Sequence, residues 1–274
     1  MLYDSTRCVG CLGCVAACAE ANFPSVVEQG LFQEPKDLGP TAKSVVRTVQ
    51  AGPSTFFLKQ QCMHCVDPAC VSVCMLGALH KEGEGKRDMG GERKGTGIVL
   101  YDKSICVGCR YCQIACPFSV PKFEWSKAFP MIVKCEMCRA RAHPGATGPL
   151  ACADPACCQA CPAGAVVFGR RTDLLAEARR RLAQKPELYN GRIYGESDNG
   201  GTQVLYLAGA GVSFARLGLP ELPTESSAQF SESVSHAPYL HGVTPIVLYG
   251  IAAFVVHRNR KLQDGTPTQP EEKP

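Results

Sequence analysis

The chain is 274 residues long and contains 18 cysteines, with 29 Lys and Arg against 25 Asp and Glu and a formal net charge of +4. A 45% share of hydrophobic residues excludes a disordered tail, and a mean hydropathy of −0.05 excludes a protein with several membrane spans. The mild charge, without a dense Lys/Arg stripe, predicts no nucleic-acid partner.

Four cysteine motifs follow one another along the chain. The first and third read C-x2-C-x2-C-x3-C, the second reads C-x2-C-x4-C-x3-C, and the fourth is C-x2-C, a long loop and C-x3-C. They comprise Cys8, Cys11, Cys14 and Cys18, then Cys62, Cys65, Cys70 and Cys74, then Cys106, Cys109, Cys112 and Cys116, and finally Cys135, Cys138, Cys157 and Cys161. The first spacing is that of bacterial ferredoxins, where three thiolates of one loop hold a [4Fe-4S] cluster and the fourth cysteine reaches a neighbouring one. Four motifs therefore predict four [4Fe-4S] clusters, with iron bound by these sixteen cysteines.

Zinc sites and disulfides are the alternative uses of so many cysteines. Three cysteines in one seven-residue run exceed what a tetrahedral zinc site takes from a single loop. Pairs separated by two residues suit a metal or redox site better than a disulfide framework. These spacings favour iron-sulfur clusters, and a zinc-stabilised scaffold without redox function stays as the competing hypothesis.

The motifs repeat in pairs. Leu2-Tyr3-Asp4 before the first motif recurs as Leu100-Tyr101-Asp102 before the third. Asp67-Pro68-Ala69-Cys70 in the second motif recurs as Asp154-Pro155-Ala156-Cys157 in the fourth. This order indicates a tandem duplication of a two-cluster ferredoxin module. The predicted fold is α+β, with small antiparallel strands flanking the cluster loops.

Other residues near the motifs are not expected to be ligands. The repeat aligns Cys157 with Cys70, which leaves Cys152 and Cys158 as small buried hydrophobes or idle thiols. His64, inside the second motif, is expected to be satisfied or solvent-facing, the alternative being a hydrogen bond that tunes a cluster. The sequence has no Gly-rich nucleotide loop, Ser-His-Asp set or open metal site with an adjacent base. We therefore expect no catalytic residues and an electron-transfer role.

Four stretches, residues 1–10, 61–74, 106–121 and 161–169, resemble the four-cluster iron-sulfur subunits of membrane oxidoreductases. The chain is most similar to the HybA type, which serves [NiFe] hydrogenases of the hydrogenase-2 class. The resemblance implies that the chain relays electrons between two partners. One is a hydrogenase with its small and large subunits, and the other is a membrane-integral quinone-reactive subunit. The alternative is the same role in a molybdopterin oxidoreductase of the formate dehydrogenase, polysulfide reductase or dimethyl sulfoxide reductase type.

The resemblance also implies a nested pairing of motif one with motif four and of motif two with motif three, whereas spacing alone equally allows sequential pairing. The implied ligand sets are Cys8, Cys11, Cys14 and Cys161 for cluster 1, Cys135, Cys138, Cys157 and Cys18 for cluster 2, Cys62, Cys65, Cys70 and Cys116 for cluster 3, and Cys106, Cys109, Cys112 and Cys74 for cluster 4. Ala19 and Met75 stand where Pro117 and Pro162 follow the other fourth cysteines. Since that proline only ends the turn, we expect ligation to survive.

The remaining segments complete the predicted organisation. The divisions are 1–60 for the first outer half with an insertion, 61–121 for the inner module, 122–170 for the second outer half, 171–236 for an amphipathic helix and an extended arm, 237–257 for a transmembrane anchor and 258–274 for a cytoplasmic tail. Within the helix, Arg179–Arg181 is expected to be a solvated face. The anchor is uncharged from 237 to 256, and His257–Lys261 follows it, so the positive-inside rule places the cluster domain on the periplasmic side of the inner membrane.

Overall fold

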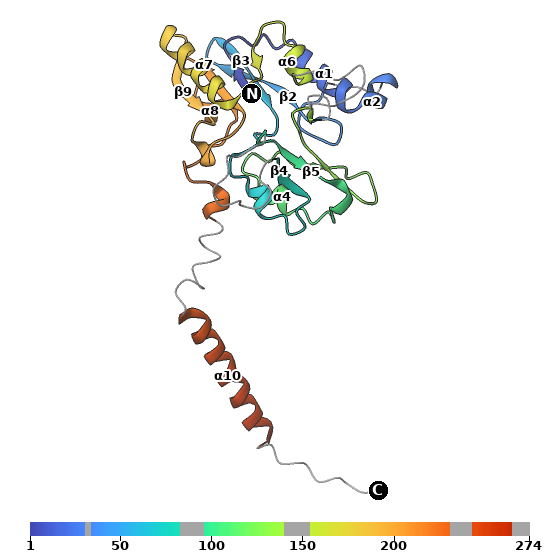
Figure 1. The fold of residues 1–274 in the computed structure, drawn as a ribbon, viewed down its shortest axis with the longest axis vertical. Coiled ribbons are helices and arrows are strands. Elements are labelled where there is room, and N and C mark those ends of the chain that lie inside the picture. Colours follow the sequence, from blue (N-terminus) through green and yellow to red (C-terminus); the bar gives the residue numbers. More distant parts are fainter. Residues whose placement is uncertain (31–33, 83–95, 140–153, 231–242, 265–274) are drawn as a thin grey trace. The chain divides into compact units, whose positions relative to one another are not determined.

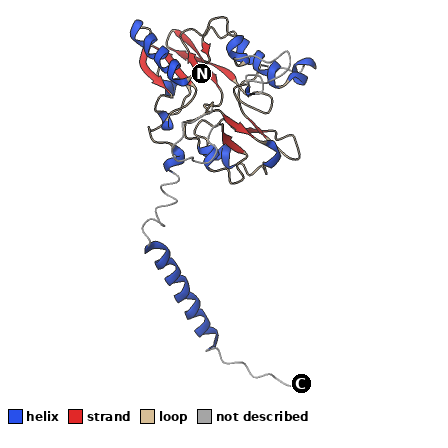
Figure 2. Ribbon diagram, in the orientation of Figure 1, coloured by secondary structure: helices blue, strands red, loops and turns tan. Residues whose placement is uncertain are grey.

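The protein, seen here as a computed structural model, divides into two units, Met1–Ala228 and Gln229–Pro274, which are described separately. The structure describes residues 1–30, 34–82, 96–139, 154–230 and 243–264 (Figure 1). The first unit carries the cysteine motifs and mixes short helices with small sheets, as Figure 2 shows. This mixture of elements agrees with the fold class that the sequence predicts.

A four-stranded sheet with the order β8-β1-β10-β9 forms the centre of the first unit. Its strands are β8 (Val166–Val167), β1 (Leu2–Asp4), β10 (Leu205–Gly209) and β9 (Tyr189–Tyr194). Every residue of β1 and β10 is buried, because these two strands pair in parallel between the outer strands. Helix α7 (Arg171–Gln184) packs Leu174 and Ala178 against Leu2 and Leu205 of this sheet.

Three two-stranded hairpins and several short helices complete the unit. The hairpins are β2 (Val45–Ala51) with β3 (Ser54–Gln60), β4 (Leu79–Lys81) with β5 (Val99–Tyr101), and β6 (Lys122–Phe123) with β7 (Ile132–Val133). The helices are α1 (Gly13–Asn22), α2 (Pro24–Glu28), α3 (Ala69–Ser72), α4 (Tyr111–Ala115), α6 (Ala156–Gln159) and α8 (Phe214–Leu217), with 3-10 turns at Lys103–Ile105 and Asp198–Gly200.

The duplicated sequence folds with the same strand register in both copies. In β1 and β8, Tyr3 lies opposite Val166, and in β5 and β4, Tyr101 lies opposite Leu79. Both partners directly follow a Gly-Ala pair of the repeat. The strand before motif one therefore pairs with the strand after motif four, and the strand before motif three pairs with the strand after motif two.

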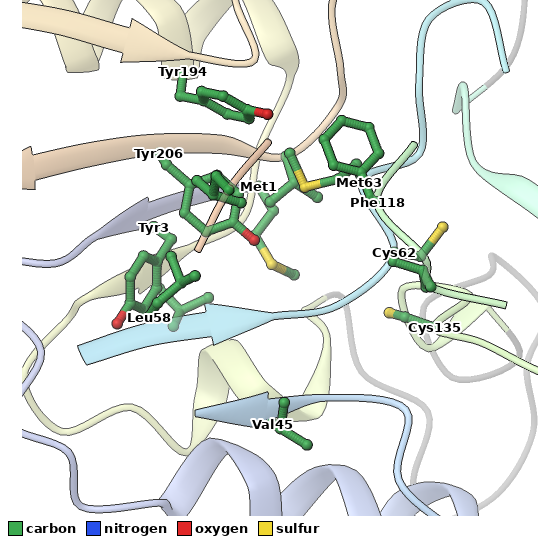
Figure 3. Packing of buried hydrophobic residues seen from close by; sticks show 14 of the residues in the cluster. Met1, Tyr3, Val45, Leu58, Cys62, Met63, Phe118, Cys135, Tyr194 and Tyr206 are labelled. Atoms are coloured by element: carbon green, nitrogen blue, oxygen red, sulfur yellow. The ribbon is translucent and has the colours of Figure 1, made fainter. Parts of the chain in front are cut away.

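The main hydrophobic core contains three buried tyrosines whose hydroxyl groups are all satisfied. Tyr3, Tyr194 and Tyr206 donate to the backbone carbonyls of Phe57, Pro220 and Lys59 at 2.6, 2.7 and 2.8 Å. Figure 3 shows these rings gathered near Met1, with Cys62 and Cys135 belonging to the same cluster. Buried phenols keep such bonds because an unpaired hydroxyl group in the core is costly.

Two expectations for residues 171–236 differ from the structure. Residues 189–209, expected as part of an extended arm, contribute β9 and β10 to the central sheet because β10 fills the space beside β1. Arg181, expected on a solvated face, is buried and bonds to the buried Asp4 carboxylate at 2.9 Å. A helix facing the sheet with Leu174 and Ala178 also turns Arg181 inward, because these positions recur on one face.

Replacing Arg181 with Met is expected to lower the free energy of unfolding by about 3–5 kcal/mol, because the buried Asp4 carboxylate loses its buried partner and keeps only the longer ion pair with the exposed Arg7. The matched control is Arg180→Met, which removes an exposed ion pair with Glu177 and leaves stability nearly unchanged. Denaturant unfolding of the iron-loaded chain measures both. Equal midpoints for the two variants would contradict the buried role of Arg181.

The second unit contains helix α10 (Val243–Asp264). No helix in the described part of the chain is long and apolar enough to cross a membrane, so the spanning anchor predicted for 237–257 is not confirmed. Residues 237–242 lie outside the described part.

Candidate metal centres

The first and third motifs fold into the same loop. Gly10 and Leu12 in the first motif have positive φ angles of 69° and 60°, and Gly108 and Arg110 in the third have 70° and 69°. This alternation curls the loop tightly, and the next residues begin α1 and α4. A Cβ at Gly10 would also lie 2.3 Å from the Phe57 ring, so only glycine fits there.

The two outer motifs meet around two cavities. Cys8, Cys11, Cys14 and Cys161 line one cavity, together with apolar side chains including Tyr3, Leu12 and Val166. Cys18, Cys135, Cys138 and Cys157 line the other. Cys14 and Cys18 lie one helical turn apart on α1 and line different cavities. The structure therefore brings Cys18 to motif four and Cys161 to motif one, the combination that the family resemblance implies.

The two inner motifs also meet. Burial raises the pKa of the Cys65 and Cys70 thiols, and both interact electrostatically with Cys62 and Cys116. Burial raises the pKa of Cys112 to about 11, and Cys109, Cys106 and Cys74 add to that shift. Cys116 thus lies near Cys65 and Cys70 of motif two, and Cys74 lies near Cys112 of motif three.

Backbone and side-chain N–H groups point at several of these sulfurs. The Leu79 amide lies 3.4 Å from Cys74 Sγ and the Ala165 amide lies 3.2 Å from Cys161 Sγ, one residue apart in the alignment of the repeat. The Met137 amide lies 3.3 Å from Cys135 Sγ. Such donors stabilise an anionic sulfur and tune the potential of a cluster that it holds.

The tyrosine before each ferredoxin run approaches the first cysteine of that run. Burial raises the pKa of Tyr3, and the electrostatic interaction with Cys8, which lines the same cavity, raises it further. Burial likewise raises the pKa of Tyr101, with a hydrogen bond to Cys106 as the next cause. The Leu-Tyr-Asp repeat therefore places one phenol beside each ferredoxin-type loop, a contact that the spacing of the cysteines does not reveal.

Two observations show that the cysteine sets suit an anionic, multi-iron group. Each outer set surrounds a cavity. Lys59, almost fully buried, lines the cavity of Cys18, Cys135 and Cys157, and no carboxylate pairs with it among the ion pairs of the described residues. A buried cation needs a nearby anion, which cluster-bound thiolates supply.

His64 is more deeply buried than the sequence led us to expect. Its Nδ1 accepts a hydrogen bond from the Val99 amide at 2.9 Å, so the proton of the neutral ring is on Nε2. Nε2 has no hydrogen-bond partner among the described residues, and burial with the nearby Lys134 charge holds the pKa of His64 well below its ordinary value. His64 is therefore not solvent-facing, Val99 satisfies one of its two nitrogens, and the alternative of a hydrogen bond toward a cluster remains a prediction.

Cys158 lies beside Cys157 without joining a set that lines a cavity. A hydrogen bond from the Cys158 thiol lowers the pKa of Cys157 to about 6, while the same bond raises the pKa of Cys158. Cys158 is half-buried, in agreement with an idle thiol. Cys152 lies outside the described residues.

The chain is similar to known iron-sulfur proteins over most of its length. Residues 53–171 match the model of the 4Fe-4S dicluster domain. The hydrogenase-2 operon protein HybA of Escherichia coli O157:H7 is 38% identical over 95% of this chain and 84% of its own. The formate dehydrogenase-O iron-sulfur subunit of Escherichia coli K12 is 32% identical over 92% of this chain and 78% of its own. The probable anaerobic dimethyl sulfoxide reductase chain YnfG of the same strain is 32% identical over 61% of this chain and 70% of its own.

Proposed function

The chain belongs to the family of iron-sulfur subunits that includes the hydrogenase-2 operon protein HybA, and we propose on that basis that it relays electrons from a [NiFe] hydrogenase toward a quinone-reactive membrane subunit. The similarity to HybA over 95% of the chain carries this proposal. The gathering of the motif cysteines into four sets supports it, since a relay needs several redox centres in one body.

We infer that four [4Fe-4S] clusters are bound by the nested sets. Cluster 1 takes Cys8, Cys11, Cys14 and Cys161, cluster 2 takes Cys135, Cys138, Cys157 and Cys18, cluster 3 takes Cys62, Cys65, Cys70 and Cys116, and cluster 4 takes Cys106, Cys109, Cys112 and Cys74. When bound, such clusters accept and release single electrons over a wide range of potentials. The protein supplies thiolates, N–H donors to sulfur and apolar walls that limit access of water.

Two exposed cysteines support a path for electrons through the protein between cluster 1 and cluster 4. Cys11 of cluster 1 and Cys109 of cluster 4 are the exposed members among the described cysteines. Val9 and Val107, equivalent in the repeat, are 63% and 71% exposed beside them. We propose that partner subunits cover these two places, because electrons must enter and leave where a cluster lies near the surface and apolar side chains favour a protein partner.

The location of the chain is also a proposal. Membership in the HybA family favours a membrane-associated complex, and we propose that the cluster domain lies on the periplasmic side of the inner membrane. Helix α10 exposes Ile246, Leu248 and Phe254, which supports a contact with an apolar surface in that complex.

The same relay in a molybdopterin oxidoreductase is the second candidate, favoured by the similarity to the formate dehydrogenase-O iron-sulfur subunit. Isolating the membrane complex that contains this chain separates the two. We expect the complex to contain nickel. We also expect hydrogen gas to reduce its clusters, which electron paramagnetic resonance (EPR) monitors. Molybdenum or tungsten without nickel, and no reduction by hydrogen, would overturn the hydrogenase assignment and retain the relay.

A further inference from the structure

Lys59 lies on β3 at the boundary between the hydrophobic core and the cysteine cavities. Neighbouring residues of a strand point to opposite faces. Leu58 accordingly packs into the core that contains Tyr3, while Lys59 lines the cavity of Cys18, Cys135 and Cys157. The hairpin that carries it belongs to the segment before motif two that the sequence marks only as an insertion.

The charge of Lys59 is not balanced by any carboxylate in the described part of the chain. Its ammonium donates one hydrogen bond to the Gln61 side chain, and its side chain is only 1% exposed. The two buried aspartates, Asp4 and Asp198, are paired with arginines instead. An ammonium has three donors, so Lys59 retains hydrogen-bonding capacity and a positive charge that no carboxylate compensates.

The groups that face Lys59 are cysteines from both outer sets. Its ammonium interacts electrostatically with Cys14 of the first set and with Cys18, Cys135 and Cys157 of the second. Lys134, another buried lysine, differs from it. Lys134 donates to the backbone carbonyls of Val99 and Cys135, and it acts on Cys70 of an inner set. Lys59 therefore faces two cysteine sets, whereas Lys134 donates to backbone carbonyls.

We propose that Lys59 is a positioning residue whose fixed positive charge, shared by the two outer cysteine sets, raises the reduction potentials of clusters 1 and 2 together. This inference rests on the proposed binding of clusters by those sets. Reduction adds one negative charge to a cluster, and a buried cation stabilises that charge strongly because the surrounding dielectric constant is low. The role needs no change of protonation, only a charge held in place by Gln61 and the walls of the cavity.

The test is an EPR-monitored redox titration of the complete membrane complex carrying Lys59→Met, with iron counted per chain. We expect two of the four midpoint potentials to shift to more negative values and the iron content to stay at the wild-type level. Signals altered by Cys14→Ser and by Cys157→Ser identify the two outer clusters. Lys59→Arg, which keeps the charge, is expected to retain both potentials, and Lys185→Met, which removes an exposed lysine, is expected to shift none.

Wild-type potentials for all four clusters in an iron-replete Lys59→Met complex would overturn the proposal. If Lys59→Met lacks iron, Lys59→Gln replaces it, since glutamine keeps a donor for Gln61 without the charge. Loss of iron in both neutral variants but not in Lys59→Arg would overturn the role in setting potentials in favour of a role in assembly. Failure of the proposed function is distinct, because it appears in the wild-type complex as missing clusters.

Discussion

Replacing Cys157 with Ser is expected to disrupt one iron-sulfur cluster and to stop electron transfer through the subunit. Cys157 lines the cavity with Cys18, Cys135 and Cys138, and serine provides a poorer ligand for iron. We expect one EPR signal to be lost or converted and hydrogen-dependent quinone reduction to fall by at least about a hundredfold, as the loss of a link in a single chain implies.

The adjacent thiol gives a matched control. Cys158→Ser changes the same atom one residue away, and this side chain only donates a hydrogen bond to Cys157. It is expected to keep all four clusters and near-normal quinone reduction. Full activity in Cys157→Ser together with cluster loss in Cys158→Ser would show that the repeat misassigns the third ligand of motif four.

Removing iron is expected to destabilise the protein by several kcal/mol. Folding of the first unit buries Lys59 next to cysteines whose thiols resist ionisation when no metal is bound, because burial raises the pKa of Cys14 to about 11 and also that of Cys135. In the iron-free protein the buried ammonium therefore faces a single thiolate, that of Cys157 with its lowered pKa, instead of several cluster-bound thiolates, and the chain also loses the cross-links between its motifs. Thermal unfolding before and after treatment with a chelator and reductant measures the difference, and iron with sulfide should reverse it.

Lys59→Met separates this electrostatic cost from the general loss of cross-links. The iron-free variant lacks the buried charge, so we expect it to unfold at a higher temperature than the iron-free wild type. An iron-free wild type as stable as the iron-loaded one, or no difference between the two iron-free proteins, would contradict the account of Lys59 as a cation that the clusters balance.

The repeated motifs predicted small antiparallel strands beside the cluster loops, but not which strands pair. Leu-Tyr-Asp and Gly-Ala recur at fixed distances from the cysteines, and the structure pairs Tyr3 with Val166 and Tyr101 with Leu79. Repetition of short segments indicates that both copies share a local geometry, whereas the partner of each strand is set only in the folded chain. The ligand sets came from family resemblance, because spacing allows two pairings and only the folded chain brings distant motifs together.

Other features could not be read from local patterns. Residues 189–209 contain glycine and polar residues between their two strands. β10 becomes a buried strand because it pairs with β1, which lies far away in the sequence. The environment of His64 depends on Val99, 35 residues away. Lys59 carried one signal, a lysine directly after the apolar stretch Phe56–Leu58 and just before motif two, but the role of its charge depends on cysteines from motifs one and four.

The central claim is that this chain holds four [4Fe-4S] clusters, and counting iron and acid-labile sulfide per chain in the purified subunit tests it most directly. The account predicts about sixteen irons and about sixteen sulfides per chain, with the brown colour of iron-sulfur proteins. About eight irons would mean that only two of the four sets are occupied. A colourless protein containing zinc in place of iron would contradict the account.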